Sequence, residues 1–194
     1  MVRFCCFIMT IALPLLFAAG ELSAETALTV KVTDSATQRV LPVRVYLQSA
    51  DGSLLHVRST SPKGSAVEYN KQRGTDSIEI HTTVSAHPFT ADLTPGKYRL
   101  TIERGKEYLP VTRTVEMGDE PVDVSIKLRR WINLASRGWF SGDTHVHRSV
   151  AELPNAQTAE DLNVALPLTH WVTKGYTPPT GGNKNSDDKL PARL

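Results

Sequence analysis

The chain has 194 residues, of which 40% are hydrophobic and 22% charged, and its formal net charge at pH 7 is +2. This length suits one domain, or one domain with part of a second. A net charge so close to zero argues against a dedicated nucleic-acid binder, which would carry a clustered basic surface.

The N-terminus has the pattern of a secretory signal peptide, which we assign to residues 1–24. Arg3 precedes an uncharged apolar run from Phe4 to Ala19, and small residues follow the run. The run is short for a membrane span, which needs about 20 residues, so we expect no stable span after cleavage. An uncleaved N-terminal anchor is the alternative. The pattern predicts a secreted or periplasmic protein.

Both cysteines of the chain, Cys5 and Cys6, lie inside this apolar run. Cleavage of the signal would remove them and leave a mature chain without disulfides or thiolate ligands. A metal ion could then be held only by histidines and carboxylates.

Residues 25–130 have the pattern of a succession of short strands. Apolar and polar side chains alternate in four runs: 28–33, 43–48, 98–103 and 122–128. This period of two is typical of strands that cover a core with one face. The Asp51-Gly52 pair predicts a hairpin turn. Weaker strands are expected at 54–58, 77–82 and 111–117, with an exposed loop over 59–75. The whole predicts an antiparallel β-sandwich.

Residues 131–175 have a different pattern. A strand is expected at residues 143–147, a short helix at 156–161 with Asn155 as its N-cap, and a second strand at 163–169. Strand, helix and strand in this order predict a βα unit of the kind that opens a parallel α/β fold. Residues 176–194, rich in Pro, Gly and Asn, are expected to be loop or disordered.

The expected strand at 143–147 carries a candidate metal motif. Asp143, His145 and His147 lie at alternate positions, so a strand would place their side chains on one face. Two imidazoles and a carboxylate suit a Zn, Mn or Fe ion. The alternative is that they are ordinary exposed strand residues. The other histidines of residues 25–130 show no such spacing, and we expect them to be solvated or half-buried: His56, His81 and His87.

Two segments resemble known families. Residues 93–108, which begin Leu-Thr-Pro-Gly-Lys-Tyr, look like part of a carboxypeptidase-regulatory-like or transthyretin-like β-sandwich. Residues 138–147, Gly-Trp-Phe-Ser-Gly-Asp-Thr-His-Val-His, resemble the opening strand of PHP (polymerase and histidinol phosphatase) metallohydrolases. The likeness is to the secreted carbaryl-hydrolase-like branch, in which a sandwich precedes the catalytic domain.

The second resemblance implies roles for several residues. His145 and His147 would ligate a divalent metal (Zn, Mn or Fe), and Asp143 would support them. The metal would activate water to hydrolyse a phosphoester, carbamate or ester bond of a small-molecule substrate. The family's second strand commonly ends Thr-Asp-His, whereas this chain has Leu-Thr-His-Trp, which leaves the role of His170 open.

The length of the sequence limits what this resemblance implies. A (β/α) barrel typically takes about 250 residues, and 57 residues run from Gly138 to the end of this sequence. We therefore assign no catalytic residue. We expect a mainly β chain, in which the sandwich is followed by the first βα unit of an incomplete PHP-type barrel. The chain would be the N-terminal fragment of a secreted hydrolase, inactive by itself.

Two alternatives stay open. The chain could be a stand-alone secreted binding module that engages a glycan, a peptide or a protein through residues 26–128. It could also be one half of a split enzyme, whose barrel a second polypeptide completes.

Overall fold

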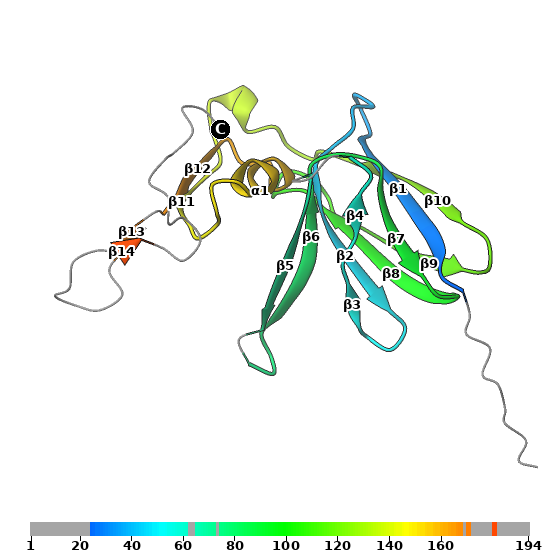
Figure 1. The fold of residues 1–194 in the computed structure, drawn as a ribbon. Coiled ribbons are helices and arrows are strands. Elements are labelled where there is room, and N and C mark those ends of the chain that lie inside the picture. The colour runs from blue at the N-terminus through cyan, green and yellow to red at the C-terminus, as the bar shows by residue number, and fades with distance from the viewer. Residues whose placement is uncertain (1–23, 62–64, 73, 169, 172–179, 182–194) are drawn as a thin grey trace, which may run out of the picture.

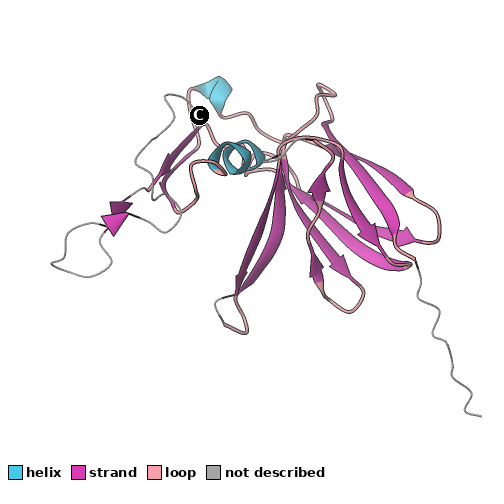
Figure 2. Cartoon of the chain, in the orientation of Figure 1, coloured by secondary structure: helices cyan, strands magenta, loops and turns pink. Residues whose placement is uncertain are grey.

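The computed structural model of the chain describes residues 24–61, 65–72, 74–168, 170–171 and 180–181 (Figure 1). Almost all of the expected signal peptide, residues 1–24, lies outside this part of the chain, as does most of the expected tail from 176 to 194. The described fold is mainly β, with one short α-helix (Figure 2). The prediction of a mainly β chain is therefore confirmed.

The strands of the N-terminal region follow one another with short connections. They are β1 (Thr26–Asp34), β2 (Val43–Ser49), β3 (Leu54–Leu55), β4 (Arg58–Ser59), β5 (Ala66–Gln72), β6 (Ile78–Val84), β7 (Phe89–Leu93), β8 (Gly96–Glu103), β9 (Val111–Met117) and β10 (Val122–Leu128). A second, smaller region contains the 3-10 turn η1 (Ala135–Arg137), β11 (Gly142–Val146), α1 (Leu153–Ala159) and β12 (Val164–Pro167), and the short strands β13 (His170–Trp171) and β14 (Thr180–Gly181) follow.

The strands of the N-terminal region form two sheets. One has the order β5-β6-β2-β8-β9, with β3 paired to β2, and all its pairs are antiparallel. The other has the order β10-β1-β7-β4, and its β1–β10 pair is parallel. The expectation of purely antiparallel sheets therefore fails at this one pair, because β10 runs alongside β1 in the same direction.

The period-two pattern of the sequence explains the core. Leu28, Val30 and Val32 of β1 are at most 1% exposed, while the side chains between them are exposed or half-buried. Buried apolar residues of both sheets pack together in one hydrophobic cluster, which includes Phe89 of β7 and Leu100 of β8. Each strand therefore turns its apolar face toward the same interior, which is what holds the two sheets together.

The turn predictions are partly confirmed. Gly52 lies between β2 and β3 with φ of +91°, in the left-handed region that favours glycine. The loop expected over residues 59–75 is wrong, because residues 66–72 form β5, which pairs with β6 along its whole length. Most of the side chains of β5 from Glu68 onward are exposed. The strand therefore lacked the apolar alternation by which strands are recognised.

The C-terminal region contains the expected strand, helix and second strand. β11 and β12 pair in parallel, with Gly142 opposite Val164 and Asp143 opposite Ala165. In the part of the chain that the structure describes, this sheet has two strands and forms no barrel. The helix begins earlier than expected, at Leu153, and Asn155 lies buried within it instead of capping it. Among the described residues, no helix is long and apolar enough to cross a membrane.

Candidate ligand-binding cleft

A cleft of about 860 Å³ lies between strands β5, β6 and β2 of the larger sheet and the C-terminal region. Its size is within the usual range for ligand sites, about 300–1,000 Å³. The strand side contributes polar and aromatic residues: Arg44, Glu68, Tyr69, Asn70, Lys71, Glu79, His81 and Thr83. The opposite side contributes Asp143, His145, Val146, His147, Arg148, Glu152, Leu153, Ala156, Gln157, Glu160, Leu162, Ala165 and Leu168.

Stacked rings form part of the strand side of the cleft. Tyr69 of β5 and His81 of β6 are directly paired across the two strands, and their ring centroids lie 4.9 Å apart in a stacked arrangement. The guanidinium carbon of Arg148, which follows β11, lies 4.5 Å from the centroid of the Tyr69 ring. This cation–π contact links the two sides of the cleft.

His81 is the most buried titratable group of the cleft, with only 2% of its side chain exposed. Burial, together with the positive charges of Arg44 and Arg148, lowers the pKa of His81 to about 3. Glu79 Oε1 lies 3.5 Å from its Nδ1, which would favour the protonated ring. Burial outweighs this contact because Glu79 is half exposed and water screens its charge. The imidazole is therefore neutral at pH 7.

We expect the stability of the fold to decrease as the pH is lowered from about 6.5 toward 3. His81 has an ordinary pKa of 6.5 and a folded-state pKa of about 3, so within this window the unfolded chain binds the extra proton. The loss amounts to at most about 1.4 kcal/mol per pH unit for this group. Urea denaturation at several pH values should give a shallower pH dependence for His81→Phe, which keeps a ring in the stack. Equal slopes in the two proteins would contradict the assignment.

Arg44 of β2 connects the strand side of the cleft to Glu160, the residue that follows α1. Its Nε donates to Glu160 Oε1 at 2.7 Å, and its Nη1 donates to the Tyr46 hydroxyl at 3.0 Å. Burial alone would lower the pKa of Arg44, but the charge of Glu160 raises it above its ordinary value. The guanidinium therefore stays charged, and the ion pair holds α1 against β2.

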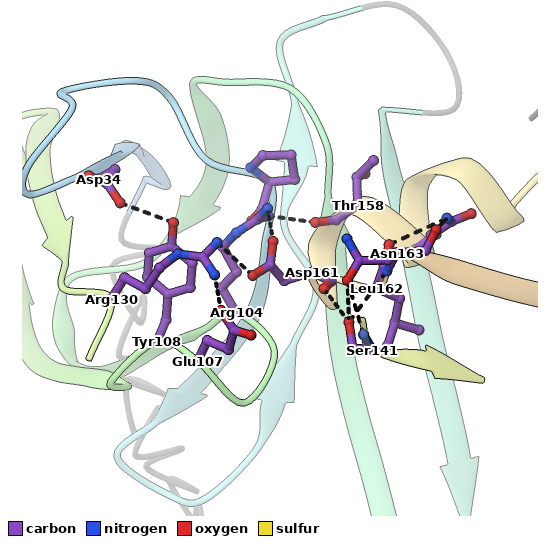
Figure 3. Close-up of polar contacts among 12 residues, drawn as sticks. Asp34, Arg104, Glu107, Tyr108, Arg130, Ser141, Thr158, Asp161, Leu162 and Asn163 are labelled. Carbon is purple, nitrogen blue, oxygen red and sulfur yellow. Dashed lines mark hydrogen bonds and ion pairs between the residues drawn. The ribbon is translucent and has the colours of Figure 1, made fainter. Parts of the chain in front are cut away.

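Asp161 forms the central contact between the two regions (Figure 3). Its Oδ1 accepts from Arg104 Nη2 at 2.6 Å and its Oδ2 accepts from Arg130 Nη2 at 2.8 Å. The Arg104 side chain is 11% exposed and that of Asp161 is 18% exposed. Arg104 Nη1 also donates to two backbone oxygens, that of Pro42 at 2.7 Å and that of Thr158 at 2.5 Å. One carboxylate after α1 thus engages two arginines of the β-rich region.

Further contacts hold both ends of this ion-pair cluster in place (Figure 3). The guanidinium of Arg130 lies 4.4 Å from the centre of the Tyr108 ring, and the Tyr108 hydroxyl donates to Asp34 Oδ2 at 3.0 Å. On the other side, the Ser141 hydroxyl donates to the Asp161 carbonyl oxygen at 3.0 Å. The Ser141 amide donates to Asn163 Oδ1, also at 3.0 Å. These bonds connect the starts of β11 and β12 to the residue that engages the arginines.

The structure brings together the two histidines of the sequence motif. His145 Nε2 and His147 Nε2 lie 3.2 Å apart at the cleft. Asp143 Oδ1 accepts from the backbone amide of His145 at 2.9 Å, so this oxygen fixes the strand rather than an imidazole. His170 lies in β13, and its side chain is outside the described residues.

The described part of the chain contains no group of three or more His, Cys, Asp or Glu side chains arranged to hold a metal ion. Binding of Zn, Mn or Fe by His145 and His147 therefore stays a prediction that rests on residue type and on the short distance between the two rings.

Sequence reasoning missed most of the cleft. Arg44 and Glu160 are 116 positions apart, and no local pattern connects them. His81 was expected to be a solvated or half-buried strand histidine, but it is buried in the side of the cleft. The sequence of β6 contains no signal for this, because residues 81–84 are all buried and show no alternation of apolar and polar side chains.

Comparisons with known proteins give only partial likenesses. No protein-family model and no curated protein matches the chain. A pilus 2b backbone protein of group B streptococcus matches at 17% identity over 55% of this chain and 41% of that one, with a TM-score of 0.36. The minor pilin of Streptococcus agalactiae matches at 19% identity over 57% and 47%, with a TM-score of 0.36. A shaft pilin domain of Lactobacillus rhamnosus GG matches at 14% identity over 55% and 98%, with a TM-score of 0.30. The chain thus spans less than half of the first two proteins.

The identification of the chain as part of a PHP-type metallohydrolase with a carboxypeptidase-regulatory-like or transthyretin-like sandwich is wrong. No protein-family model matches the chain, and no curated protein of either family matches it. The assignment as a hydrolase fragment, and the metal-binding classification that came with it, lose their support. The physical reason is that three residues at alternate positions of a strand are too short a pattern to identify a fold. In the described residues β11 and β12 form a two-stranded parallel sheet, and no barrel is present.

Proposed function

We propose that this chain is an extracytoplasmic β-sandwich binding module that takes a hydroxyl-rich ligand, such as a glycan, in the cleft between the sandwich and the C-terminal region. The observation that carries the proposal is the cleft itself, whose walls come from both regions. Support for an extracytoplasmic location comes from the basic residue and apolar run at the N-terminus. The expected absence of nucleic-acid partners stays a prediction from the near-neutral charge.

The chemistry of the cleft suits a ligand with many hydroxyl groups. A hydroxyl both donates and accepts hydrogen bonds, so it pairs equally well with carboxylates, amides and guanidinium groups. Side chains of all three kinds line the cleft, for example the carboxylate of Glu68, the amide of Asn70 and the guanidinium group of Arg44. A few polar groups that converge beside aromatic rings are the usual means by which a pocket orients such a ligand.

The cleft also has the rigidity that binding requires. The Arg44–Glu160 pair and the Arg148–Tyr69 contact join its two walls. The Asp161 ion-pair cluster lies outside the cleft and joins the two regions to which the walls belong. A site that is already ordered loses little conformational entropy when the ligand enters. The proposed ligand would therefore bind to a preformed site, and its polar groups would select it.

A glycan array probed with the purified chain tests this function, and calorimetry on the glycans retained provides the affinities. Asn70 and Lys71 line the cleft and have exposed side chains, so the double change Asn70→Ala with Lys71→Ala should leave the fold intact. We expect it to weaken binding by at least about fivefold, which corresponds to the loss of one or two hydrogen bonds.

The matched control is Arg113→Ala on β9, an exposed change outside the cleft lining, which should bind as the unchanged chain does. If the array retains no glycan above background, the proposed ligand class is wrong. If the cleft variant and the control bind equally, the ligand lies elsewhere on the surface.

A further inference from the structure

Exposed apolar residues are concentrated in the C-terminal region. Of the nine large hydrophobic residues that are exposed in the described part of the chain, six lie between positions 131 and 166. We call these six the aromatic face: Trp131, Leu134, Trp139, Phe140, Val164 and Leu166. Trp139 and Phe140 are 70% and 69% exposed. Exposed apolar surface gathered in this way usually marks an interaction site.

Short contacts place the segments that carry these six residues next to one another. The amides of Trp131 and Leu134 both donate to Glu107, at 2.9 Å to its backbone oxygen and 3.3 Å to its carboxylate. Glu107 and Leu134 then line a groove of about 280 Å³ together with Trp139, Phe140 and Ser141. The backbone oxygen of Ser141 accepts from the amide of Val164 at 3.1 Å, which brings β12 to the same surface.

The β11–β12 sheet explains why this surface is bare. Ala165 is 7% exposed on the side that carries α1, whereas its neighbours Val164 and Leu166 are 46% and 51% exposed on the other side. Parallel strands are normally covered on both faces. In the described structure α1 covers Ala165, whereas Val164 and Leu166 on the opposite face of β12 lack a packing partner. The side chains of β11 before Val146 are exposed as well.

We propose that the aromatic face is a self-association surface that docks on the aromatic face of a second copy of this chain. A two-fold interface must be complementary to itself, with projections and recesses on the same patch. This patch has both. Trp139 and Phe140 project into solvent, and the apolar groove that they line lies directly beside them. The Trp131 indole is held in place because its Nε1 donates to the Lys106 backbone oxygen at 2.9 Å.

The size and charge of the surface favour this partner. The exposed parts of the six side chains amount to roughly 600 Å² per copy, counting about 200 Å² for a whole aromatic residue. A standard interface buries about 800 Å² per partner, so the apolar face and a polar rim around it suffice. Tryptophan is also enriched among the residues that dominate interface energies. The net charge of +2 leaves little repulsion between two copies.

Sedimentation of the purified full chain between about 1 and 100 µM tests the proposal, with a dimer as the expected species at the upper end. Trp139→Ser with Phe140→Ser should raise the dissociation constant more than about tenfold. Both side chains are largely exposed, so the melting temperature should not change at concentrations where the unchanged chain is monomeric. Val164→Thr with Leu166→Thr, on the strand part of the face, should weaken the dimer in the same direction.

The matched control is Ile78→Ser, which removes a hydrophobic side chain that is 49% exposed on β6 and should leave the dimer intact. A wild-type chain that stays monomeric at all of these concentrations would overturn the proposal. The aromatic face would then have to bind a different protein. A dimer that persists in both double variants would also overturn it, because association would then come from another part of the chain. Glycan binding in the cleft should be the same in all these variants, so this test is independent of the proposed function.

Discussion

Gly105→Ala is expected to destabilise the chain by about 3–4 kcal/mol, because it removes the close approach between the two regions. Gly105 has φ of +47°, and a Cβ built there would lie 2.4 Å from the Glu160 carbonyl oxygen and 2.9 Å from Asp161 Cβ. Both of these atoms belong to the turn that follows α1. The backbone of Gly105 cannot move far, since Arg104 on one side of it is engaged with Asp161. The added carbon must therefore displace the C-terminal region.

Chemical denaturation measures the loss of stability in Gly105→Ala, and hydrogen exchange shows which segments of the chain are destabilised. We expect the amides of α1 and β12 to exchange faster in Gly105→Ala, while those of β1 and β8, in the core, change much less. Gly118→Ala is the matched control, because its added carbon meets no atom within 4 Å and its φ is not in the left-handed region. Equal stabilities for the two variants would show that the docked arrangement of α1 does not depend on this contact.

Asp161→Asn is expected to cost about 2–3 kcal/mol, somewhat below the 3–5 kcal/mol typical of a fully buried pair that loses one partner. The substitution keeps the shape of the side chain and suits the positive φ of +56° at this position. It removes the one charge that Arg104 and Arg130 share. Arg104, with 11% of its side chain exposed, would keep a buried positive charge without its carboxylate. Urea denaturation at neutral pH measures the change.

A second ion pair of the chain provides the control for Asp161→Asn. Lys97 and Glu116 lie 3.0 Å apart with side chains that are 71% and 70% exposed. Because water screens such a pair, Glu116→Gln should change stability by less than about 1 kcal/mol. A similarly small change in stability for Asp161→Asn would mean that the Asp161 cluster orders side chains but does not stabilise the contact between the C-terminal region and the β-rich region. The position of α1 would then depend on packing and on the Arg44–Glu160 pair.

Local pattern was sufficient to predict the strands of the core. Alternation at residues 28–33, 43–48, 98–103 and 122–128 predicted four strands that the structure contains as β1, β2, β8 and β10. The signal is reliable there because each of these strands buries one face, which requires an apolar residue at every second position. β5 has no such requirement along most of its length, and it was mistaken for a loop.

The helix boundary shows how tertiary contacts override a local signal. Asn155 has the chemistry of an N-cap, but its side chain is only 3% exposed and its Nδ2 donates to Ser85 Oγ at 3.2 Å. Ser85 directly follows β6, 70 positions earlier in the chain. A capping rule weighs only neighbouring residues, so it cannot anticipate a partner from a distant strand. The helix therefore begins at Leu153, with Pro154 in its first turn, where proline is well tolerated.

The sequence by itself determined the mainly β character of the chain, the change of pattern after residue 130 and the common location of His145 and His147. All three depend on residues close together along the chain, where backbone periodicity decides which side chains share a face. Only the tertiary structure decided that a cleft exists, that Arg44, His81 and Glu160 line it together, and that two apolar residues of β12, Val164 and Leu166, stay exposed. These features depend on the contact between the β-rich region and the C-terminal region, in which Asp161 binds Arg104 and Gly105 lies against the turn after α1. Contacts between residues so far apart are set by packing and charge pairing in three dimensions, for which a single sequence carries no periodic signal.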